Sequence, residues 1–413
     1  MDHSKRYENT LVALLFFSWG TLFLDRTSLH SLAPYFVPEF HLSHQQVGML
    51  GSVLAIAWAL SALFFGALSD RVGRKSILIP MVFIFSLMSC ASGMVHSYKE
   101  LLLVRALLGL AGGPAWSIMT AMIEESSLPM RRGRNIGIVV SAAALVGLAV
   151  APVLTTQMAA RVGWRWAFYV SGMPGLLLAL LIWRFVKEPE RENRTGPHGQ
   201  PMRFAEFLSV LRYRNMWLCC AGAAGFLSWL FLHNIFAPLY ITEVAHQTPT
   251  TAGFLMGASG LGSFFLALYF PRLSDRLGRK PVLLLMAAMC TIVPLAMLIT
   301  PLYSYPWALA AIVCMANAGQ GIGALILVLV PTESVPPQFA ATAIGLATLA
   351  AEGIGATLAP MLAGPMVKSY GLGAAMWMSA GGAVLVFLVA LMLKETHLAR
   401  APSPVLQEAS GTD

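Results

Sequence analysis

The chain has 413 residues, of which 57% are hydrophobic and only 11% are charged, and its mean hydropathy is +0.70. A soluble domain averages about 25% charged residues, so this composition excludes a soluble protein with a single closed core. The net charge is +8, and the surplus apolar surface is expected to face lipid.

Twelve apolar runs follow one another along the chain, separated by short polar breaks. Each is close to the roughly 20 residues that a helix needs to cross the hydrocarbon core. Backbone polar groups in lipid must bond within their own segment, so these runs predict helices and not the short alternating strands of a barrel. The first run contains Asp25 and Arg26 and leads directly into another span, which is not typical of a cleaved signal peptide. The predicted fold is an all-α membrane protein with spans at 11–36, 45–68, 76–96, 99–122, 134–158, 165–186, 215–242, 250–270, 281–300, 305–330, 338–365 and 372–393.

Basic residues gather on one side of the predicted membrane. Of the 27 lysines and arginines, 21 lie on the side that holds both termini and the loops at 66–75, 131–134, 187–214 and 272–280. Loops rich in Lys and Arg stay in the cytoplasm, so we expect both termini there and the chain in the inner membrane of the cell. The positive charge is therefore interpreted as a topology signal and not as a nucleic-acid-binding surface.

The longest polar stretch, 187–214, separates the spans into two sets of six. The predicted organisation is an N-terminal segment 1–10, a six-helix bundle 11–186, a cytoplasmic linker 187–214, a second bundle 215–394 and a disordered tail 395–413. The two sets repeat each other, because Gly66-Ala-Leu-Ser-Asp-Arg-Val-Gly-Arg-Lys recurs 205 positions later as Pro271-Arg-Leu-Ser-Asp-Arg-Leu-Gly-Arg-Lys. The stretches that begin at Glu125 and Gly163 have partners 208 positions later. Three repeats in register indicate duplication.

The stretch from Gly66 to Lys75, with the pattern G-x-L-S-D-R-x-G-R-K, resembles the cytoplasmic loop motif of the major facilitator superfamily. Its repeat between spans eight and nine and the stretch Arg105-Ala-Leu-Leu-Gly109 also match that family, and the resemblance covers residues 8–395. It implies two pseudo-symmetric six-helix bundles that transport by alternating access, without enzyme activity, cofactor or bound metal. We expect a monomer whose partners are a small-molecule substrate, protons and the lipid bilayer, with no nucleic acid.

The resemblance also implies that charged residues at the two motif loops latch the bundles together in the outward-open state. An acid near the start of a helix is favoured by the helix dipole and can pair with an arginine of a neighbouring segment. The alternative is that these charges only anchor helix ends at the lipid headgroups. The predicted gating residues are Asp70, Arg71, Arg74 and Glu125 (or its neighbour Glu124) in the first half, and Asp275, Arg276, Arg279 and Glu333 in the second.

Four ionisable residues are predicted at membrane depth, where a charge costs at least about 2.5–3.5 kcal/mol and therefore suggests function. Asp25 and Arg26 point roughly 100° apart on a helix, so they face different neighbours. We expect Arg26 to bind substrate as a forked donor, and Asp25 to carry the coupling proton while paired with Arg105. A purely structural Asp25–Arg105 bridge remains the alternative. Glu352 is a second candidate for proton coupling, since its duplicate position is Ala144; a neutral, hydrogen-bonded acid is the alternative.

Other polar and aromatic side chains on the predicted spans are candidates for contact with substrate. Lone polar residues within a bundle more often join helices than bind ligands, and that alternative stays open for each of them. Together with Arg26 and Arg105, the predicted substrate-binding set consists of His30, Trp116, His233, Tyr240, Asn317 and Gln320.

Asp25-Arg26-Thr-Ser-Leu29 resembles the D-R-x-x-L pattern of anion:cation symporters and of spinster-like lipid carriers. Those groups often place an acid seven residues after the span-four arginine, where this chain has Gly112. The sequence predicts a proton-coupled symporter of a small organic anion, such as a carboxylate or sugar acid. The alternatives are a proton-coupled exporter of drugs or metabolites, whose span-five glycine motif is largely missing here, and a lysolipid or sphingolipid carrier. The sequence contains no nucleotide-binding loop or nucleophile–base spacing that would indicate an enzyme.

Overall fold

The structure, a computed structural model, describes residues 5–188, 210–336 and 339–396. All regular structure within these ranges is helical, and twelve helices are long and apolar enough to cross a membrane. The predicted all-α fold with twelve spans is confirmed. Residues 1–4, most of the predicted linker and most of the predicted tail lie outside the described residues.

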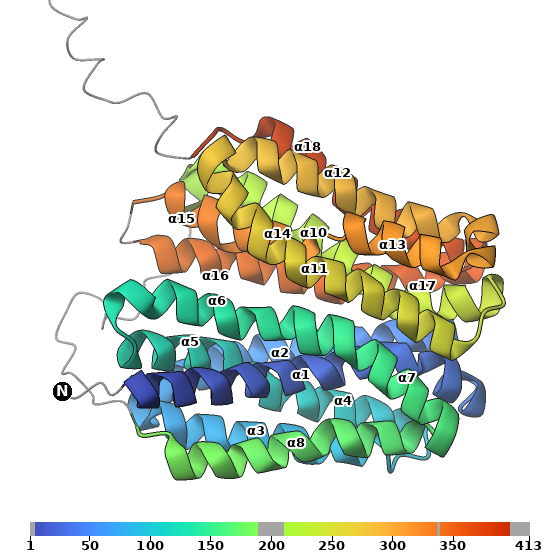
Figure 1. The fold of residues 1–413 in the computed structure, drawn as a ribbon, viewed down its shortest axis with the longest axis horizontal. Coiled ribbons are helices and arrows are strands. Elements are labelled where there is room, and N and C mark those ends of the chain that lie inside the picture. The colour runs from blue at the N-terminus through green and yellow to red at the C-terminus, as the bar shows by residue number, and fades with distance from the viewer. Residues whose placement is uncertain (1–4, 189–209, 337–338, 397–413) are drawn as a thin grey trace, which may run out of the picture.

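The first half forms the lower layer in Figure 1, coloured blue to green. Its helices begin where the sequence supplies caps: Ser43 and Gln46 form a capping box at the start of α2, and the Ser97 hydroxyl accepts a bond from Glu100 N at the start of α4. A short turn η1 (Pro129–Arg131) precedes the fifth span. The spans are α1 (Lys5–Glu39), α2 (His44–Val72), α3 (Arg74–Ser92), α4 with α5 (Tyr98–Gly112, Ala115–Ser126), α6 with η2 and α7 (Arg132–Ala142, Ala143–Val150, Ala151–Val162), and α8 (Trp164–Phe185).

The second half forms the upper layer in Figure 1, coloured yellow-green to red. Its short turns are η4 (Val210–Arg212) and η6 (Thr300–Ser304). The spans are α10 with η5 (Arg214–Leu239, Tyr240–Val244), α11 (Pro249–Leu277), α12 (Arg279–Leu298), α13 with α14, η7 and α15 (Pro306–Ala316, Gly319–Gly323, Ala324–Leu329, Val330–Glu333), α16 with η9 and α17 (Ala340–Ala350, Ala351–Leu358, Ala359–Tyr370), and α18 (Gly373–Met392).

Two spans carry a π-helical segment at matching places in the duplication. η2 in the fifth span and η9 in the eleventh are eight residues each and begin 208 positions apart. Pro152 and Pro360 follow them within two residues and lack the N–H that a regular helix would use. π segments are rare and occur frequently at functional sites, and η9 contains Glu352.

The two halves pack tightly at one end of the molecule, which we call the closed end and define by His44, Gly48, Glu243 and Pro360. There α2 packs on α17 and η9, and α11 packs on α7 and η2. A Cβ added at Gly48 would lie 2.6 Å from the Pro360 carbonyl oxygen, so only glycine permits this approach. His44 Nε2 lies 3.0 Å from Glu243 Oε2 and joins the first half to the second.

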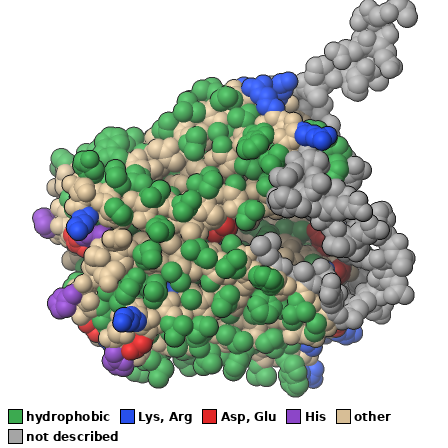
Figure 2. Space-filling view, turned by 180° about the vertical axis from the view of Figure 1, so that it is seen from behind, with side chains coloured by type: hydrophobic (Ala, Val, Ile, Leu, Met, Phe, Trp, Pro, Cys, Tyr) green, Lys and Arg blue, Asp and Glu red, His purple; other side chains and the backbone are tan. Residues whose placement is uncertain are grey.

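The opposite end, which we call the motif end, holds the α2–α3 and α11–α12 connections at Gly73 and Gly278. Figure 2 shows the surface hollowed between the two halves toward the side where the grey residues lie, and histidines gathered at the other side. The halves are therefore packed together at the closed end, and the hollow between them lies nearer the motif end.

Candidate functional site

Asp25, near the middle of α1, is held entirely within the first half. Its carboxylate accepts a bond from Arg105 Nη1 of α4 at 3.0 Å and another from the Ser89 hydroxyl of α3. Arg105 donates its other terminal nitrogen, Nη2, to Ser92 Oγ at 2.7 Å and lies over the ring of Phe168. Both charged side chains are fully buried. The terminal nitrogens of Arg105, a predicted substrate residue, are thus used within the first half.

Arg26, the next residue, points in a different direction and reaches the second half. Its Nη2 atom lies 3.5 Å from Glu352 Oε2 of η9. The guanidinium carbon is 4.5 Å from the ring centre of Phe231 in α10 and 5.0 Å from that of Trp58 in α2. Aromatic faces stabilise a guanidinium without using its hydrogen-bond donors. Arg26 is therefore surrounded by aromatic rings where the halves meet.

Hydrogen bonding around Arg26 is incomplete. The Nε and Nη2 atoms of Arg26 and the Oε2 atom of Glu352 are buried and have no hydrogen-bond partner among the residues that the structure describes. A charge-assisted N–H···O bond is usually about 2.7–2.9 Å long, so the pair at 3.5 Å is loose. A guanidinium with spare donors in a low-dielectric setting is suited to bind a carboxylate.

Other predicted substrate residues of the first half lie near this guanidinium. His30, one turn after Arg26, is 5% exposed, and its ring lies close to Gly51 of α2. Trp116 of α5 is half-buried, and its ring centre lies 5.0 Å from that of Trp19. Trp19 in turn packs on Trp58, which contacts Arg26. The aromatic side chains thus form a continuous group beside the arginine.

The predicted residues of the second half mostly bond to their own bundle. The side-chain amide of Asn317 donates from Nδ2 to Ser259 Oγ at 2.8 Å and accepts at Oδ1 from Gly319 N. These two bonds join α11 to the break between α13 and α14. The Tyr240 hydroxyl donates to the Leu298 carbonyl at 3.5 Å. Gln320 is half-buried, and its backbone N–H bonds to Ser263 Oγ. These contacts are typical of helix–helix packing, and a substrate role for these three residues stays a prediction.

His233 is 1% exposed, and neither of its ring nitrogens has a hydrogen-bond partner within the described part of the chain. Its ring stacks parallel to Trp229 at 6.1 Å between centres. Trp229 is itself held by a bond from its Nε1 to the Cys290 carbonyl at 2.9 Å. His233 is thus packed inside the second half on a fixed aromatic surface.

The predicted gating residues form one ion-pair cluster in each half. Arg74 Nη2 lies 3.3 Å from Glu125 Oε1, and Arg279 pairs with Glu333 at 2.8 Å and with Asp275 at 2.6 Å. These pairs join residues of the same half and do not bridge the halves in this structure. Arg276 is exposed, as is Glu124, and the side chains of Asp70 and Arg71 lie outside the described residues.

Two acids that are not among the predicted site residues, Glu188 and Glu395, complete these clusters. The backbone N–H groups of Arg74 and Lys75, which follow Gly73, donate to the Glu188 carboxylate. Those of Arg279 and Lys280, which follow Gly278, donate to Glu395. Both glycines have φ above +100°, which favours glycine. Glu395 had been assigned to a disordered tail, but it and Thr396 lie among the described residues. The repeated Lys-Glu after the last span of each half was the available signal.

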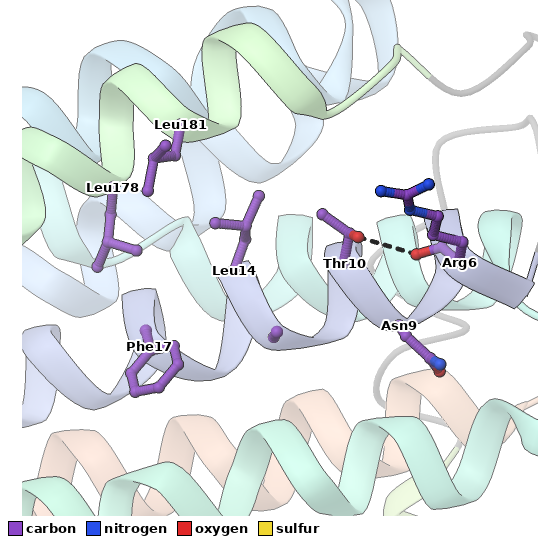
Figure 3. Close-up of a pocket in the computed structure, with 8 residues that line it drawn as sticks. Arg6, Asn9, Thr10, Leu14, Phe17, Leu178 and Leu181 are labelled. Atoms are coloured by element: carbon purple, nitrogen blue, oxygen red, sulfur yellow. Dashed lines mark hydrogen bonds between the residues drawn. The ribbon is translucent and has the colours of Figure 1, made fainter.

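The structure also contains a groove of about 530 Å³ on the outside of the first half, between α1 and α8 (Figure 3). Apolar side chains line most of it, and polar groups gather near Arg6, where Thr10 bonds to the Arg6 carbonyl. None of the predicted site residues lines this groove. Its lining consists of Arg6, Asn9, Thr10, Ala13, Leu14, Phe17, Leu178 and Leu181.

Comparison with known proteins gives a family and several relatives. A sequence profile described as the Major Facilitator Superfamily matches residues 15–352. The chain is 30% identical to a probable L-galactonate transporter of Escherichia coli (strain K12), over 62% of this chain and 60% of that protein. It is 30% identical to a probable 4-methylmuconolactone transporter of Cupriavidus pinatubonensis, over 82% and 79% of the two chains. It is 28% identical to the cis,cis-muconate transport protein of Acinetobacter baylyi, over 86% and 87%.

The fold is similar to that of a solved bacterial homologue of the human lysosomal transporter spinster, in its inward-facing and unoccupied conformation. The TM-score is 0.73 at 21% sequence identity, and the match covers 94% of this chain and 95% of that one. This similarity supports the twelve-helix architecture. From the profile match and the relatives, the chain belongs to the major facilitator superfamily, a family of membrane transporters and not of enzymes.

Proposed function

We propose that the protein is a secondary active transporter that moves a small organic anion, a carboxylate or sugar acid, in symport with protons by alternating access. The observation that carries the proposal is Arg26, a buried guanidinium with two unbonded nitrogens, held where the two halves meet. The forked guanidinium matches the geometry of a carboxylate, as it does that of a phosphate. The names of two relatives, the galactonate and muconate transporters, point to organic acids.

Proton coupling is assigned to the two acids at membrane depth that face arginines. Asp25 pairs with Arg105 inside the first half, and Glu352 pairs with Arg26 across the halves. Protonation of either acid would remove the charge that neutralises its arginine, and it would thereby change which contacts that arginine makes. An acid–arginine pair therefore links the proton gradient to the position of a charged group.

We infer that both termini and the motif end are cytoplasmic, in the inner membrane of the cell. Arg74, Lys75, Arg279 and Lys280 lie at the motif end, and cytoplasmic loops are enriched in such residues. The closed end would then face outward, and the structure would be the inward-facing state.

This orientation is tested with two single-cysteine variants, Arg134→Cys and Lys99→Cys, and a thiol reagent that does not cross the membrane. In intact cells only Lys99→Cys should react.

The anion proposal is tested by thermal shift of the purified protein with L-galactonate, D-galacturonate, cis,cis-muconate and the cation tetraphenylphosphonium. A ligand at 100 times its Kd stabilises a protein by about 2.7 kcal/mol, which is readily seen as a rise in Tm. We expect at least one acid to stabilise the wild type and to have no effect on Arg26→Ala.

The matched control is Arg165→Ala, because Arg165 pairs with Glu39 at 2.7 Å near the ends of α8 and α1 and does not contact Arg26. This variant should respond to the acid as the wild type does. Stabilisation by tetraphenylphosphonium alone, or an unchanged acid response in Arg26→Ala, would contradict an anion site at Arg26.

A further inference from the structure

The Arg26–Glu352 pair joins the two halves of the molecule. Arg26 belongs to α1 of the first half, and Glu352 belongs to the π-helical segment η9 of the second. Asp25 and Arg105, by contrast, both belong to the first half and are linked further through Ser89 and Ser92. Rocking of the halves would leave the Asp25–Arg105 distance unchanged and would change the distance from Arg26 to Glu352.

The Arg26–Glu352 pair is also incomplete in a way that suits exchange of partners. Arg26 is 6% exposed, and the Glu352 side chain is 15% exposed, so both charges need a counter-charge. Leaving one buried charge unpaired is strongly unfavourable, because the charge has lost its hydration and gained no partner. The contact is 3.5 Å long, however, and the Nη2 and Oε2 atoms that form it complete no hydrogen bond. A carboxylate that met the spare donors of Arg26 at normal distance would bind more strongly than Glu352 does.

The asymmetry of the duplication supports the same conclusion. The position that duplicates Glu352 in the first half is Ala144, in η2. A scaffold role common to both halves therefore does not explain this acid.

We propose that Glu352 is an internal counter-anion that occupies Arg26 in the empty transporter, and that its protonation releases Arg26 to the carboxylate of the transported acid. This inference rests on the proposed anion function and adds the means by which one proton is tied to one anion. Arg26 balances a single negative charge. Glu352 and the substrate carboxylate therefore compete for it, and the neutral acid form of Glu352 is required when substrate is bound.

The groups around Glu352 leave Arg26 as its charged partner. The elements packed on η9 are α2, α10, α16 and α17. Near the Arg26–Glu352 pair, the ionisable residue of α10 is His233, which stacks on Trp229. Those of α1 are His30 and Asp25, and Arg105 neutralises Asp25. α16 has no ionisable side chain, and α10 also carries the thiols Cys219 and Cys220. The remaining ionisable residues of these packed elements lie in first or last helical turns: His44, Asp70, Arg71, Arg214, Lys368 and Tyr370.

The exchange of partners also accounts for obligatory coupling. The empty transporter can change conformation because ionised Glu352 neutralises Arg26. The loaded transporter can do so because the substrate carboxylate neutralises Arg26 while Glu352 carries the proton. Substrate without a proton would place two carboxylates on one guanidinium. A proton without substrate would leave Arg26 buried and unpaired. Both of these states are costly, so neither ion crosses alone.

The test measures binding of cis,cis-muconate, D-galacturonate and L-galactonate to purified protein by calorimetry between pH 5.5 and 8.5, in two buffers of different ionisation enthalpy. For the wild type we expect uptake of one proton for each anion bound. Where Glu352 is mostly ionised, Kd should rise tenfold for each pH unit, because the competent fraction falls tenfold. In Glu352→Gln, which mimics the protonated acid, we expect no proton uptake and a Kd that stays at its low-pH value.

Glu39→Gln serves as the control, since Glu39 is an acid of α1 paired with Arg165 far from Arg26, and it should keep the wild-type pH dependence. Wild-type proton uptake and pH dependence in Glu352→Gln would overturn this inference alone. Failure of all three acids to bind the wild type at any pH would instead contradict the anion function itself. If Glu352→Gln does not fold, infrared spectroscopy of the wild type and of Glu352→Asp takes its place. Substrate binding should then add a protonated-carboxyl band to the wild-type spectrum, and the frequency of this band should shift in Glu352→Asp. An unshifted band would overturn the inference.

Discussion

At the scale of single residues, the central feature is that neighbouring charges in α1 take partners in different halves. Asp25 bonds to Arg105 at 3.0 Å within the first half, and Arg26 approaches Glu352 at 3.5 Å in the second. The difference follows from the 100° rotation between successive helical residues. One pair is short and fully satisfied at the acid, and the other is loose and spans the two halves.

Asp25→Asn is expected to lower stability strongly, because it leaves the Arg105 charge buried without a counter-charge. Removing one partner of a buried pair costs about 3–5 kcal/mol. Adding Arg105→Gln should recover part of this loss, so the double variant should be more stable than Asp25→Asn alone. Chemical denaturation of the four proteins of this cycle in detergent gives the coupling energy.

The exposed pair of Glu39 and Arg165 provides the comparison, since their side chains are 41% and 32% exposed and such pairs contribute about 0–1 kcal/mol. Glu39→Gln should therefore change stability little. If Asp25→Asn proved equally mild, Asp25 would be neutral in the folded protein, and its pairing with Arg105 would not stabilise the bundle.

At the scale of helices, the two motif loops are built alike from residues far apart in the sequence. α3 and α12 each begin after a glycine with positive φ, and each donates its first two N–H groups to a glutamate that follows the last span of its half. Glu188 and Glu395 thus neutralise the positive end of the helix dipole and tie the end of each bundle to its motif loop.

Glu188→Gln and Glu395→Gln should each lower stability by about 0.5–2 kcal/mol, since each loses a charged cap of a helix N-terminus. The effects should be alike because the caps are equivalent by duplication. Tm measurements against Glu124→Gln, an exposed acid near the same end, test this. Equal Tm values for the cap variants and Glu124→Gln would show that the caps do not contribute.

At the scale of the whole molecule, the structure is one state of a carrier whose halves are closed at one end. His44 and Glu243 join the halves there at 3.0 Å, and Gly48 lies directly against the Pro360 carbonyl. The ion pairs described at the motif end instead connect residues of one half, as with Arg279 and Glu333. Among the described gating residues, those that form ion pairs are thus held within their own bundles here.

Cross-linking the closed end should stop transport. Cysteines at His44 and Glu243, in a chain whose five native cysteines are replaced by serine, can be bridged by a short bifunctional methanethiosulfonate. Alternating access requires these two positions to separate, so uptake of cis,cis-muconate into vesicles should cease and return after treatment with a reductant. Each single cysteine variant should be unaffected by the reagent. Full uptake with the bridge in place would show that the closed end does not open during transport.

The sequence could predict those features of the site that depend on one segment alone, and it could not predict contacts between segments far apart in the chain. Asp25, Arg26, Arg105 and Glu352 were identifiable from the cost of charge at membrane depth. The asymmetric position of Glu352 was visible in the duplication. Its partner was not, because α1 and η9 are more than 300 residues apart in the chain, and their contact depends on helix tilt and rotation. The repeated Lys-Glu marks Glu188 and Glu395 as equivalent, but the helix that each one caps lies more than 100 residues away in the chain and is identified only by the fold.

The sequence by itself determined twelve spans, their division into two repeated halves and the family, because bilayer thickness and backbone hydrogen bonding act on each segment separately. Only the tertiary structure decided which arginine each buried acid faces, which end of the molecule is closed and that Arg26 lies between aromatic rings of both halves. Those outcomes depend on distances of a few ångströms between helices, and the electrostatic and packing energies that set them change steeply over such distances.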